Sequence, residues 1–261
     1  MNINGVLGIL AAIGMFVASL MMSSGSASVF FNTHGIFIVF GGTLAACMLC
    51  FPLPTLFGLT KVIFQKILGK FSHRHEMVIR EIVDLAKGNR ENPSYLNQNV
   101  ANIKTHFLKE AVELQIQGGI TDDEIDVILE KRAATHFVRY EEEAAIFKTM
   151  AKFPPAFGLM GTTLGMITLL NSLGSPDSMK SLGPSMAIGL VATLYGIALA
   201  NLVFIPMAEN LSKMTKDDEI LRDIVMDGVK LVRQKKHPLV VEEYLQSYLL
   251  PKERTKAKKA A

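Results

Sequence analysis

Residues 153–170 read FPPAFGLMGTTLGMITLL, and residues 184–207 read PSMAIGLVATLYGIALANLVFIPM. Neither stretch contains a charged side chain, and each is close to the roughly 20 apolar residues that a helix needs to cross a bilayer. Two further apolar stretches precede them, Ile3–Met22 and Val29–Phe51, separated by the polar turn Ser23–Ser26. The sequence therefore predicts four transmembrane helices, arranged as two hairpins.

The distribution of charge supports this prediction. The 261-residue chain is 49% hydrophobic and 20% charged, with a mean hydropathy of +0.30. No charged residue occurs from Met1 to Thr60, and only Asp177 and Lys180 occur from Phe153 to Ala208. Such a composition excludes a disordered chain, a collagen-like repeat and a secreted disulfide scaffold. It predicts an all-α membrane protein with charged soluble parts, rather than a globular enzyme.

Orientation follows from the positions of Lys and Arg, which accumulate on the cytoplasmic side of membranes. All of them except Lys180 lie between residues 61 and 152 or between residues 213 and 259. We therefore expect both termini in the cytoplasm. Met1–Gly5 lacks the basic residues that begin a signal peptide, so the first apolar stretch is expected to be retained. The expected domains are a membrane hairpin (1–51), a cytoplasmic helical domain (52–152), a second hairpin (153–208) and a cytoplasmic tail (209–261).

The cytoplasmic segments carry helical periodicity and no strand pattern. Helix formation is predicted for the following ranges: Thr55–Phe71, either on the membrane surface or packed on other helices; Glu76–Lys87, ending at Gly88-Asn89; Ser94–Gln117; Asp217–Lys235; and Val240–Leu250. Thr121 and Glu124 have the spacing of a capping box. The helix that they begin is expected to run without a break into Phe153. The basic run Lys252–Lys259 is expected to be a disordered tail attracted to anionic lipids rather than a nucleic-acid site.

The predicted spans contain no carboxylate that could relay ions. Membrane ion paths are nearly always marked by a charged side chain, and these spans have no Asp, Glu, Lys or Arg. Any carboxylate in an ion path must therefore come from a partner. His34 is expected at a span boundary. Cys47 and Cys50 are expected to be two small buried residues on one helix face, because a metal or redox site would require further ligands.

Small and hydroxyl residues form a stripe on each of the last two spans: Gly158, Gly161, Thr162, Gly165 and Thr168 on one, and Ser185, Gly189, Thr193, Gly196 and Ala200 on the other. Steps of three and four align these residues along a helix, and small residues allow helices in a bilayer to approach closely. Ordinary packing accounts for the glycines, and it accounts less well for the threonines, which can offer oxygen ligands. Pro154-Pro155 and Pro206 lie where the two spans meet the cytoplasm. They predict either two bends at one level or two simple helix boundaries.

The chain resembles the MotA/PomA family of motor stator subunits, within the wider MotA/TolQ/ExbB group. The resemblance rests on two motifs. One is Pro154–Gly165 (PPAFGLMGTTLG), and the other comprises Gly183–Ala187 (GPSMA), Ala192–Gly196 (ATLYG) and Asn201–Pro206 (NLVFIP). Four spans with a large insert match MotA rather than the three-span TolQ and ExbB.

This resemblance implies a ring of five subunits around a dimer of a MotB/PomB-like protein in the bacterial inner membrane. That partner has one span with an essential Asp and a domain that binds peptidoglycan. Ion passage past the Asp turns the ring and drives a FliG-like rotor for flagellar motility, without a cofactor or nucleic acid. The ion path would involve Thr162, Thr163, Thr193 and Tyr195, and torque coupling would involve Pro155 and Pro206. The ion is H⁺ or Na⁺, and Thr162 favours Na⁺ because its hydroxyl supplies a hard oxygen ligand.

The expected rotor contact departs from the pattern of the family. Flagellar members carry a basic residue and then acidic residues at the turn after the first cytoplasmic helix. Lys87 or Arg90 matches the basic position, whereas the acidic positions read Asn97 and Gln98. The expected rotor-contact residues are Lys87, Arg90 and Glu91. Two alternatives therefore stay open: a TolQ/ExbB-like energiser or non-flagellar stator, and a membrane scaffold without ion flux. An enzyme is not expected, because no nucleophile–base pair or metal cluster was found in the sequence.

Overall fold

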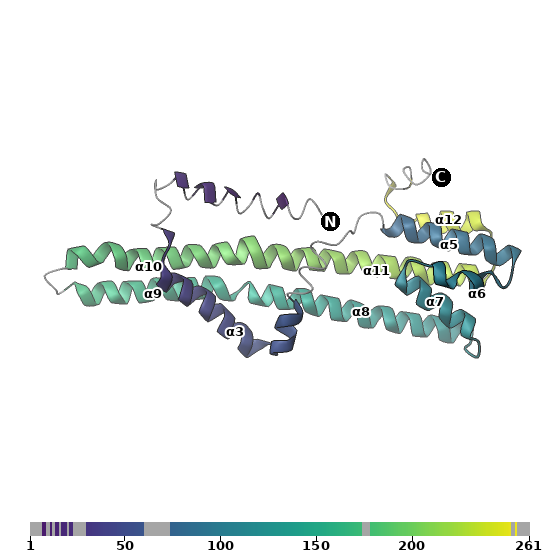
Figure 1. Cartoon of the computed structure of the whole chain (residues 1–261), viewed down its shortest axis with the longest axis horizontal. Helices are drawn as coiled ribbons and strands as arrows, with labels where there is room; N and C mark the ends of the chain where they lie inside the picture. Colours follow the sequence, from purple (N-terminus) through teal and green to yellow (C-terminus); the bar gives the residue numbers. More distant parts are fainter. Residues whose placement is uncertain are drawn as a thin grey trace. The chain divides into compact units, whose positions relative to one another are not determined.

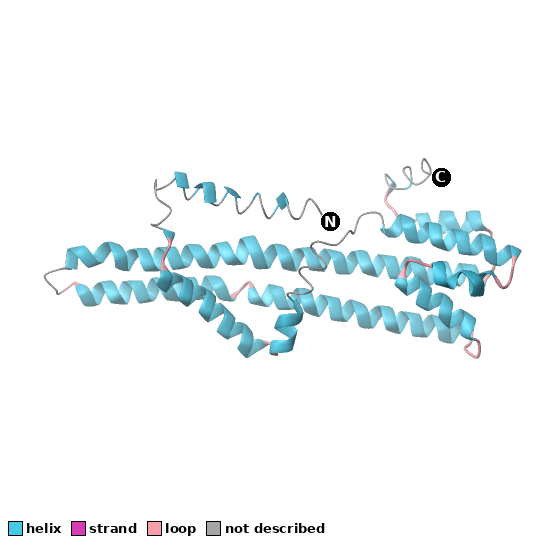
Figure 2. Cartoon of the chain, in the orientation of Figure 1, coloured by secondary structure: helices cyan, strands magenta, loops and turns pink. Residues whose placement is uncertain are grey.

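The computed structural model describes residues 30–59, 74–173, 178–251 and 254, together with scattered positions between residues 7 and 22. Every regular element among these residues is helical, and none is a strand (Figure 2). The chain divides into two compact units. We name the units by the location expected from the sequence: the membrane unit comprises Met1–Lys70 and Glu141–Ser212, and the cytoplasmic unit comprises Phe71–Tyr140 and Lys213–Ala261. Helices α8 (Asp122–Met150) and α11 (Ile205–Arg233) contribute to both.

Three helical stretches of the described chain are long and apolar enough to cross a membrane: Thr33–Cys50, and segments within Asp122–Ser172 and Leu182–Arg233. They coincide with the second, third and fourth predicted spans. The second span is built from α2 (Thr33–Ile36), the π-helix η2 (Phe37–Gly41) and α3 (Gly42–Cys50). The predicted first span, Ile3–Met22, lies mostly outside the described residues.

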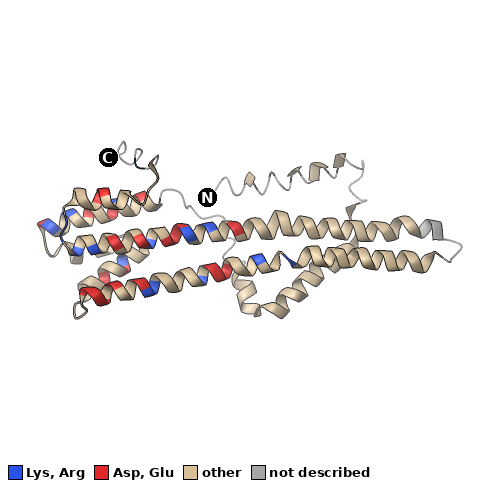
Figure 3. Ribbon diagram, turned by 180° about the vertical axis from the view of Figure 1, so that it is seen from behind, with Lys and Arg blue, Asp and Glu red and all other residues tan. Residues whose placement is uncertain are grey.

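The last two spans are α9 (Phe153–Ser172) and α10 (Ser178–Leu199), which lie side by side (Figure 1). Figure 3 shows that both are almost free of charged residues. The helix that carries the predicted fourth span begins at Ser178, so Pro184 lies inside α10. The proline is tolerated because α10 packs against α9 from Ser185 onward, and that packing offsets the hydrogen bond that Pro184 removes.

Both helices of this pair are interrupted where they meet the cytoplasmic helices. Between α8 and α9, Ala151 and Lys152 form a turn, so the predicted unbroken helix is wrong at this point (Figure 2). Pro154 and Pro155 follow, and neither has an N–H to donate to the preceding turn. In the other helix of the hairpin, the π-helix η4 (Ala200–Phe204) separates α10 from α11, and Pro206 is the second residue after it.

The segment after the second span packs on the protein. Residues 53–59 are helical, and the rest of the predicted helix Thr55–Phe71 lies outside the described residues. Leu59 is buried in a small core with Phe147 and Leu211. For its described part, this burial favours packing on other helices over attachment to the membrane surface.

The cytoplasmic unit surrounds one hydrophobic core. Its elements are α5 (Arg74–Glu91), α6 (Tyr95–Asn99), the 3₁₀-helix η3 (Val100–Asn102), α7 (His106–Gln117), α12 (Pro238–Gln246) and parts of α8 and α11. The centre of the core takes one side chain from each long helix: Ile82, Leu108, Leu129, Ile224 and Leu245. Full burial of such side chains contributes about 1.5–3 kcal/mol each.

Two predicted helix boundaries in this unit are wrong. Helix α5 was expected to end at Gly88-Asn89 but continues to Glu91. Gly88 lies beneath the ring of Tyr95, where a Cβ would collide, and the Asn89 side chain donates 3.2 Å to the carbonyl of Val232. Both residues therefore serve packing here rather than helix termination.

The predicted helix Ser94–Gln117 is interrupted between α6 and α7. The cause is Glu81 on α5, whose carboxylate accepts from the backbone N–H of Lys104 at 3.2 Å and from Thr105 Oγ1 at 2.9 Å. These bonds hold the chain in an extended turn at Ile103.

The capping box at the start of α8 is confirmed. Thr121 N–H donates to Glu124 Oε2 at 2.8 Å, and Glu124 N–H donates to Thr121 Oγ1 at 3.4 Å. The carboxylate also accepts from Thr121 Oγ1 at 2.8 Å. The two bonds that it accepts from Thr121, foremost the one from the backbone, lower the pKa of Glu124. Helices α11 and α12 occupy the ranges predicted for the tail, and the basic run Lys252–Lys259 lies outside the described residues apart from Arg254.

Candidate ion-path and hinge site

The two glycine-bearing stripes meet along the α9–α10 contact. A Cβ added at Gly189 would lie 2.8 Å from Thr162 Cα, and one added at Gly165 would lie 2.7 Å from the carbonyl oxygen of Ser185. Real Cβ atoms do not approach other atoms so closely, so the two helix backbones are in direct contact. The close approach predicted from the sequence is therefore confirmed. It allows short side chains to reach across the interface.

A pair of hydroxyl groups lies at the centre of this contact. Thr162 Oγ1 and Thr193 Oγ1 are 2.6 Å apart, which is a hydrogen bond between the helices. Thr193 Oγ1 also lies 3.1 Å from the carbonyl oxygen of Gly158, and Thr162 Oγ1 lies 3.3 Å from that of Gly189. The cluster therefore concentrates two hydroxyl and two carbonyl oxygens in an otherwise apolar stretch. Both threonines are half-buried, so the cluster has an accessible side.

The other two predicted ion-path residues lie elsewhere. Thr163 is exposed and donates 2.8 Å to the carbonyl of Leu159 in its own helix. The hydroxyl of Tyr195 donates to the carbonyl of Phe30 and accepts from Asn32 N–H at 3.2 Å. Tyr195 thus attaches the start of the second span to α10, and no feature of the sequence indicated this contact.

Pro155 lies against the opposite helix. Gly196 of α10 is seated on the backbone of Pro154-Pro155, where a Cβ would overlap the carbonyl oxygen of Pro154. The first turn of α9, which directly follows the turn between α8 and α9, is therefore in direct contact with α10. A change of angle at this turn would move α10 unless the two backbones separated.

Pro206 lies just beyond the π-helix η4, and its ring is exposed. Phe204 and Met207, on either side of it, pack with Phe147 and Met150 at the end of α8. The two helix interruptions therefore lie at one level of the membrane unit, which is the arrangement that a paired hinge requires.

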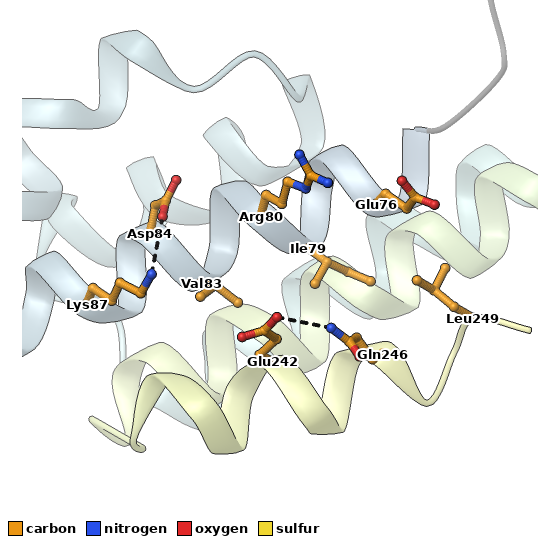
Figure 4. A pocket seen from close by; sticks show the side chains of 9 residues that line it. All are labelled: Glu76, Ile79, Arg80, Val83, Asp84, Lys87, Glu242, Gln246 and Leu249. Carbon is orange, nitrogen blue, oxygen red and sulfur yellow. Dashed lines mark hydrogen bonds and ion pairs between the residues drawn. The ribbon is translucent and has the colours of Figure 1, made fainter. Parts of the chain in front are cut away.

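The expected rotor-contact residues Lys87, Arg90 and Glu91 lie at the end of α5 and are exposed. The ammonium group of Lys87 is 4.0 Å from Asp84. Figure 4 shows Lys87 beside a groove between α5 and α12, which also contains Arg80 and Glu242. Asn97 and Gln98 are exposed on α6.

Sequence reasoning missed two arginines of α11 that each contact another helix of the cytoplasmic unit, Arg222 on Phe107 and Arg233 on Asp126. Arg222 contacts Asp218 at 2.7 Å and lies 4.5 Å above the ring of Phe107. Arg233, whose side chain is 5% exposed, binds Asp126 on α8. The four-residue spacing of Asp218 and Arg222 was a signal available in the sequence.

In the described part of the chain, no group of three His, Cys, Asp or Glu side chains could hold a metal ion. Both cysteines are free. Cys47 is buried but Cys50 is exposed, so the expected buried pair is only half correct. The membrane unit thus offers hydroxyl and carbonyl oxygens, a close helix contact and two interruptions of its helices, and residues 33–50, 153–172 and 182–208 contain no Asp, Glu, Lys or Arg.

Comparison with known proteins agrees with this geometry. Residues 99–224 match the MotA/TolQ/ExbB proton channel family. The chain is 30% identical to the chemotaxis protein PomA of Vibrio alginolyticus, with 95% of this chain and 96% of that protein covered. It is also 30% identical to motility protein A of Aquifex aeolicus, with coverage of 93% and 94%. Its fold is similar to a chain of the flagellar MotAB stator complex from Bacillus subtilis, with a TM-score of 0.85, 26% identity, and 96% and 97% of the two chains covered.

Proposed function

The chain belongs to the MotA/TolQ/ExbB proton channel family, and we infer that it is a stator subunit of the bacterial flagellar motor. The observation that carries this function is the similarity, over nearly the full length, to PomA and to motility protein A proteins, together with the shared fold of a MotAB stator chain. The chain is a multi-pass membrane channel subunit and not an enzyme.

The partner is a MotB/PomB-like protein with one transmembrane helix, around which five copies of this chain form a ring. The sequences of Phe153–Ser172 and Leu182–Ala208 supply no charged side chain. An ion crossing hydrocarbon requires such a group, so the partner's span provides the carboxylate.

The topology is four spans with both termini in the bacterial cytoplasm. The hairpins 1–51 and 153–208 lie in the inner membrane, and 52–152 and 209–261 form the cytoplasmic parts. The support is the one-sided distribution of Lys and Arg.

The ion passes the oxygen cluster of Thr162 and Thr193, and Thr163 and Tyr195 complete the polar residues of the path. The support is the 2.6 Å hydroxyl pair and its two neighbouring carbonyls. Na⁺ is favoured over H⁺ because an alkali cation needs hard oxygen ligands, which these groups supply.

Pro155 and Pro206 couple ion passage to motion of the cytoplasmic helices. The support is that Gly196 is seated against Pro154-Pro155, and that a π-helix precedes Pro206. Lys87, Arg90 and Glu91, all exposed at the end of α5, contact the rotor, which is a FliG-like protein.

The test is to express the chain with and without its MotB-like partner in a cell that lacks both stator subunits. We expect swimming only with both chains, and co-purification as a five-to-two complex. Rescue of an outer-membrane transport process instead of swimming would assign the chain to the energiser branch of the family. Purification of the chain as a stable ring without the partner, combined with no effect on swimming, would support the scaffold alternative.

A further inference from the structure

A cavity of about 480 Å³ lies in the membrane unit beside the hinge. Its walls come from α3, residues 53–59, the end of α8, η4 and the start of α11, and they include Thr43, Cys47, Leu56, Phe147, Phe204 and Met207. Almost every lining side chain is apolar. The volume falls within the range of small-molecule pockets, which is roughly 300–1,000 Å³.

One polar atom in this cavity has no partner. Thr43 is 4% exposed, and its Oγ1 is buried without a hydrogen bond. A threonine in a helix normally satisfies its hydroxyl on the carbonyl four residues earlier. Buried hydroxyls left without a partner are rare and costly, so this one indicates a missing acceptor.

The backbone around the cavity is also unusual. Phe40 belongs to the π-helix η2, and Val203 and Phe204 belong to the π-helix η4, and all three line the cavity. π-helical turns are rare and occur frequently at functional sites. Two of them, from different spans, border the same volume.

The surroundings identify the occupant. Leu44, Met48 and Phe57 line the cavity and are themselves exposed, so its rim continues into the apolar outer surface of the span. Just beyond the cavity residues Met150 and Met207, charged side chains begin, with Lys148 and Glu209 4.0 Å apart. The cavity therefore lies at the edge of the hydrocarbon layer, where lipid tails are the solvent and their ester groups are the nearest hydrogen-bond acceptors.

We propose that this cavity binds one acyl chain of a membrane phospholipid, whose ester carbonyl accepts a hydrogen bond from Thr43 Oγ1. Moving an acyl chain from the bilayer into this cavity costs no apolar transfer free energy, because both environments are apolar. The side chains that line the cavity gain dispersion contacts with the acyl chain. Because the cavity borders η4 and the residues beside Pro206, the bound chain supports the hinge from one side. The proposed orientation of the protein places this lipid in the inner leaflet, and that placement rests on the proposed function.

The test uses the complex of the full chain with its partner, reconstituted in nanodiscs that contain a phosphatidylethanolamine with a photoreactive diazirine on one acyl chain. After irradiation, the labelled peptides are mapped by mass spectrometry. We expect label on the peptides that contain Thr43 and Met207. Cys47→Phe fills the cavity and should reduce this label about tenfold, the factor that corresponds to ~1.4 kcal/mol. Cys50→Phe, its matched control on an exposed position of the same helix, should leave the label unchanged.

Thr43→Val keeps the shape of the side chain and removes the hydroxyl, so it tests the site even if Cys47→Phe disturbs folding. It should reduce the label about fivefold, as expected for the loss of one neutral hydrogen bond. The proposal is overturned if labelling of these peptides is unaffected by both variants, or if the probe labels only outer-surface residues such as Leu170. These readouts do not require ion flux, so a failure of the lipid site is distinguishable from a failure of ion transport.

Discussion

The hydroxyl pair of Thr162 and Thr193 joins two spans that have no charged side chain in residues 153–172 and 182–208. Each hydroxyl is held by a neighbouring carbonyl, so the oxygens are fixed in place before an ion arrives. Such fixed ligands favour an ion that must exchange its water for protein oxygens. The glycines at 158 and 189 matter because any larger residue would separate the helices and the hydroxyls with them.

We therefore expect Thr162→Val and Thr193→Val each to reduce ion flux about tenfold or more, the magnitude of losing a hydrogen bond to a charged group. Thr168→Val is the matched control, since that exposed hydroxyl bonds only to Leu164 of its own helix. Flux is measured by ion uptake into vesicles that contain the complex. Unchanged flux in both variants, with the complex intact, would exclude the pair from the ion path.

The contact of Gly196 with Pro154 gives a stability prediction. Gly196→Ala places a methyl group on the backbone of the α8–α9 turn, so the helices must separate, at a cost of about 1–3 kcal/mol. Gly183→Ala, in the same helix, has nothing within 4 Å of an added Cβ and should be neutral. The check is the thermal unfolding midpoint of the purified complex. Equal midpoints for the two variants would contradict the close contact.

Helix boundaries that depend on local sequence patterns were predicted, whereas those that depend on contacts with residues distant in the sequence were missed. Thr121 and Glu124 satisfy each other locally, so the start of α8 could be predicted. Glu81 breaks the helix before α7 from more than 20 residues away, and Tyr95 covers Gly88 from the next helix. Neither contact can be predicted from the sequence around the helix boundary. The candidate site divides in the same way: the glycine stripes are periodic, whereas the bond from Tyr195 to Phe30 is purely tertiary.

The two hinges give a prediction about elements rather than single contacts. Pro155→Leu and Pro206→Leu restore a backbone donor to the helix and should straighten the interruptions. We expect the complex to assemble at normal levels while swimming torque is lost. Pro238→Leu is the control, because a proline at the first position of α12 removes no helical bond. Loss of the assembled ring in either hinge variant would assign that proline to folding instead.

Helix α11 carries a carboxylate whose titration affects stability. Partial burial, and then the negative charges of Glu219 and Asp227, raise the pKa of Asp223. The folded state therefore holds this proton more tightly than the unfolded state. The associated stability is present below the unfolded pKa and is lost as the pH rises through the folded pKa.

Asp223→Asn should therefore raise the thermal stability of the full chain at neutral pH and make that stability depend less on pH in the acidic range. Asp217→Asn, on an exposed position of the same helix, should change neither. Thermal unfolding of both variants across pH 4–8 is the measurement, and a lower stability of Asp223→Asn at neutral pH would contradict the assignment.

Over the whole chain, charge is partitioned between two units with different chemistry. The cytoplasmic unit uses charges structurally, as in the contact of Arg222 with Asp218 and Phe107. The membrane unit keeps its spans free of charge and concentrates oxygen at one point of the α9–α10 contact. In the function proposed above, this chain lines the ion path and the MotB-like partner supplies the acid that the path requires.

The most direct test of this account is ion flux into vesicles that contain this chain alone, this chain with its MotB-like partner, or this chain with a partner whose membrane Asp is replaced by Asn. We predict flux only for the combination with the intact partner, in the presence of either H⁺ or Na⁺ as the driving ion. Flux of the same size from this chain alone would contradict the conclusion that the essential carboxylate belongs to another protein.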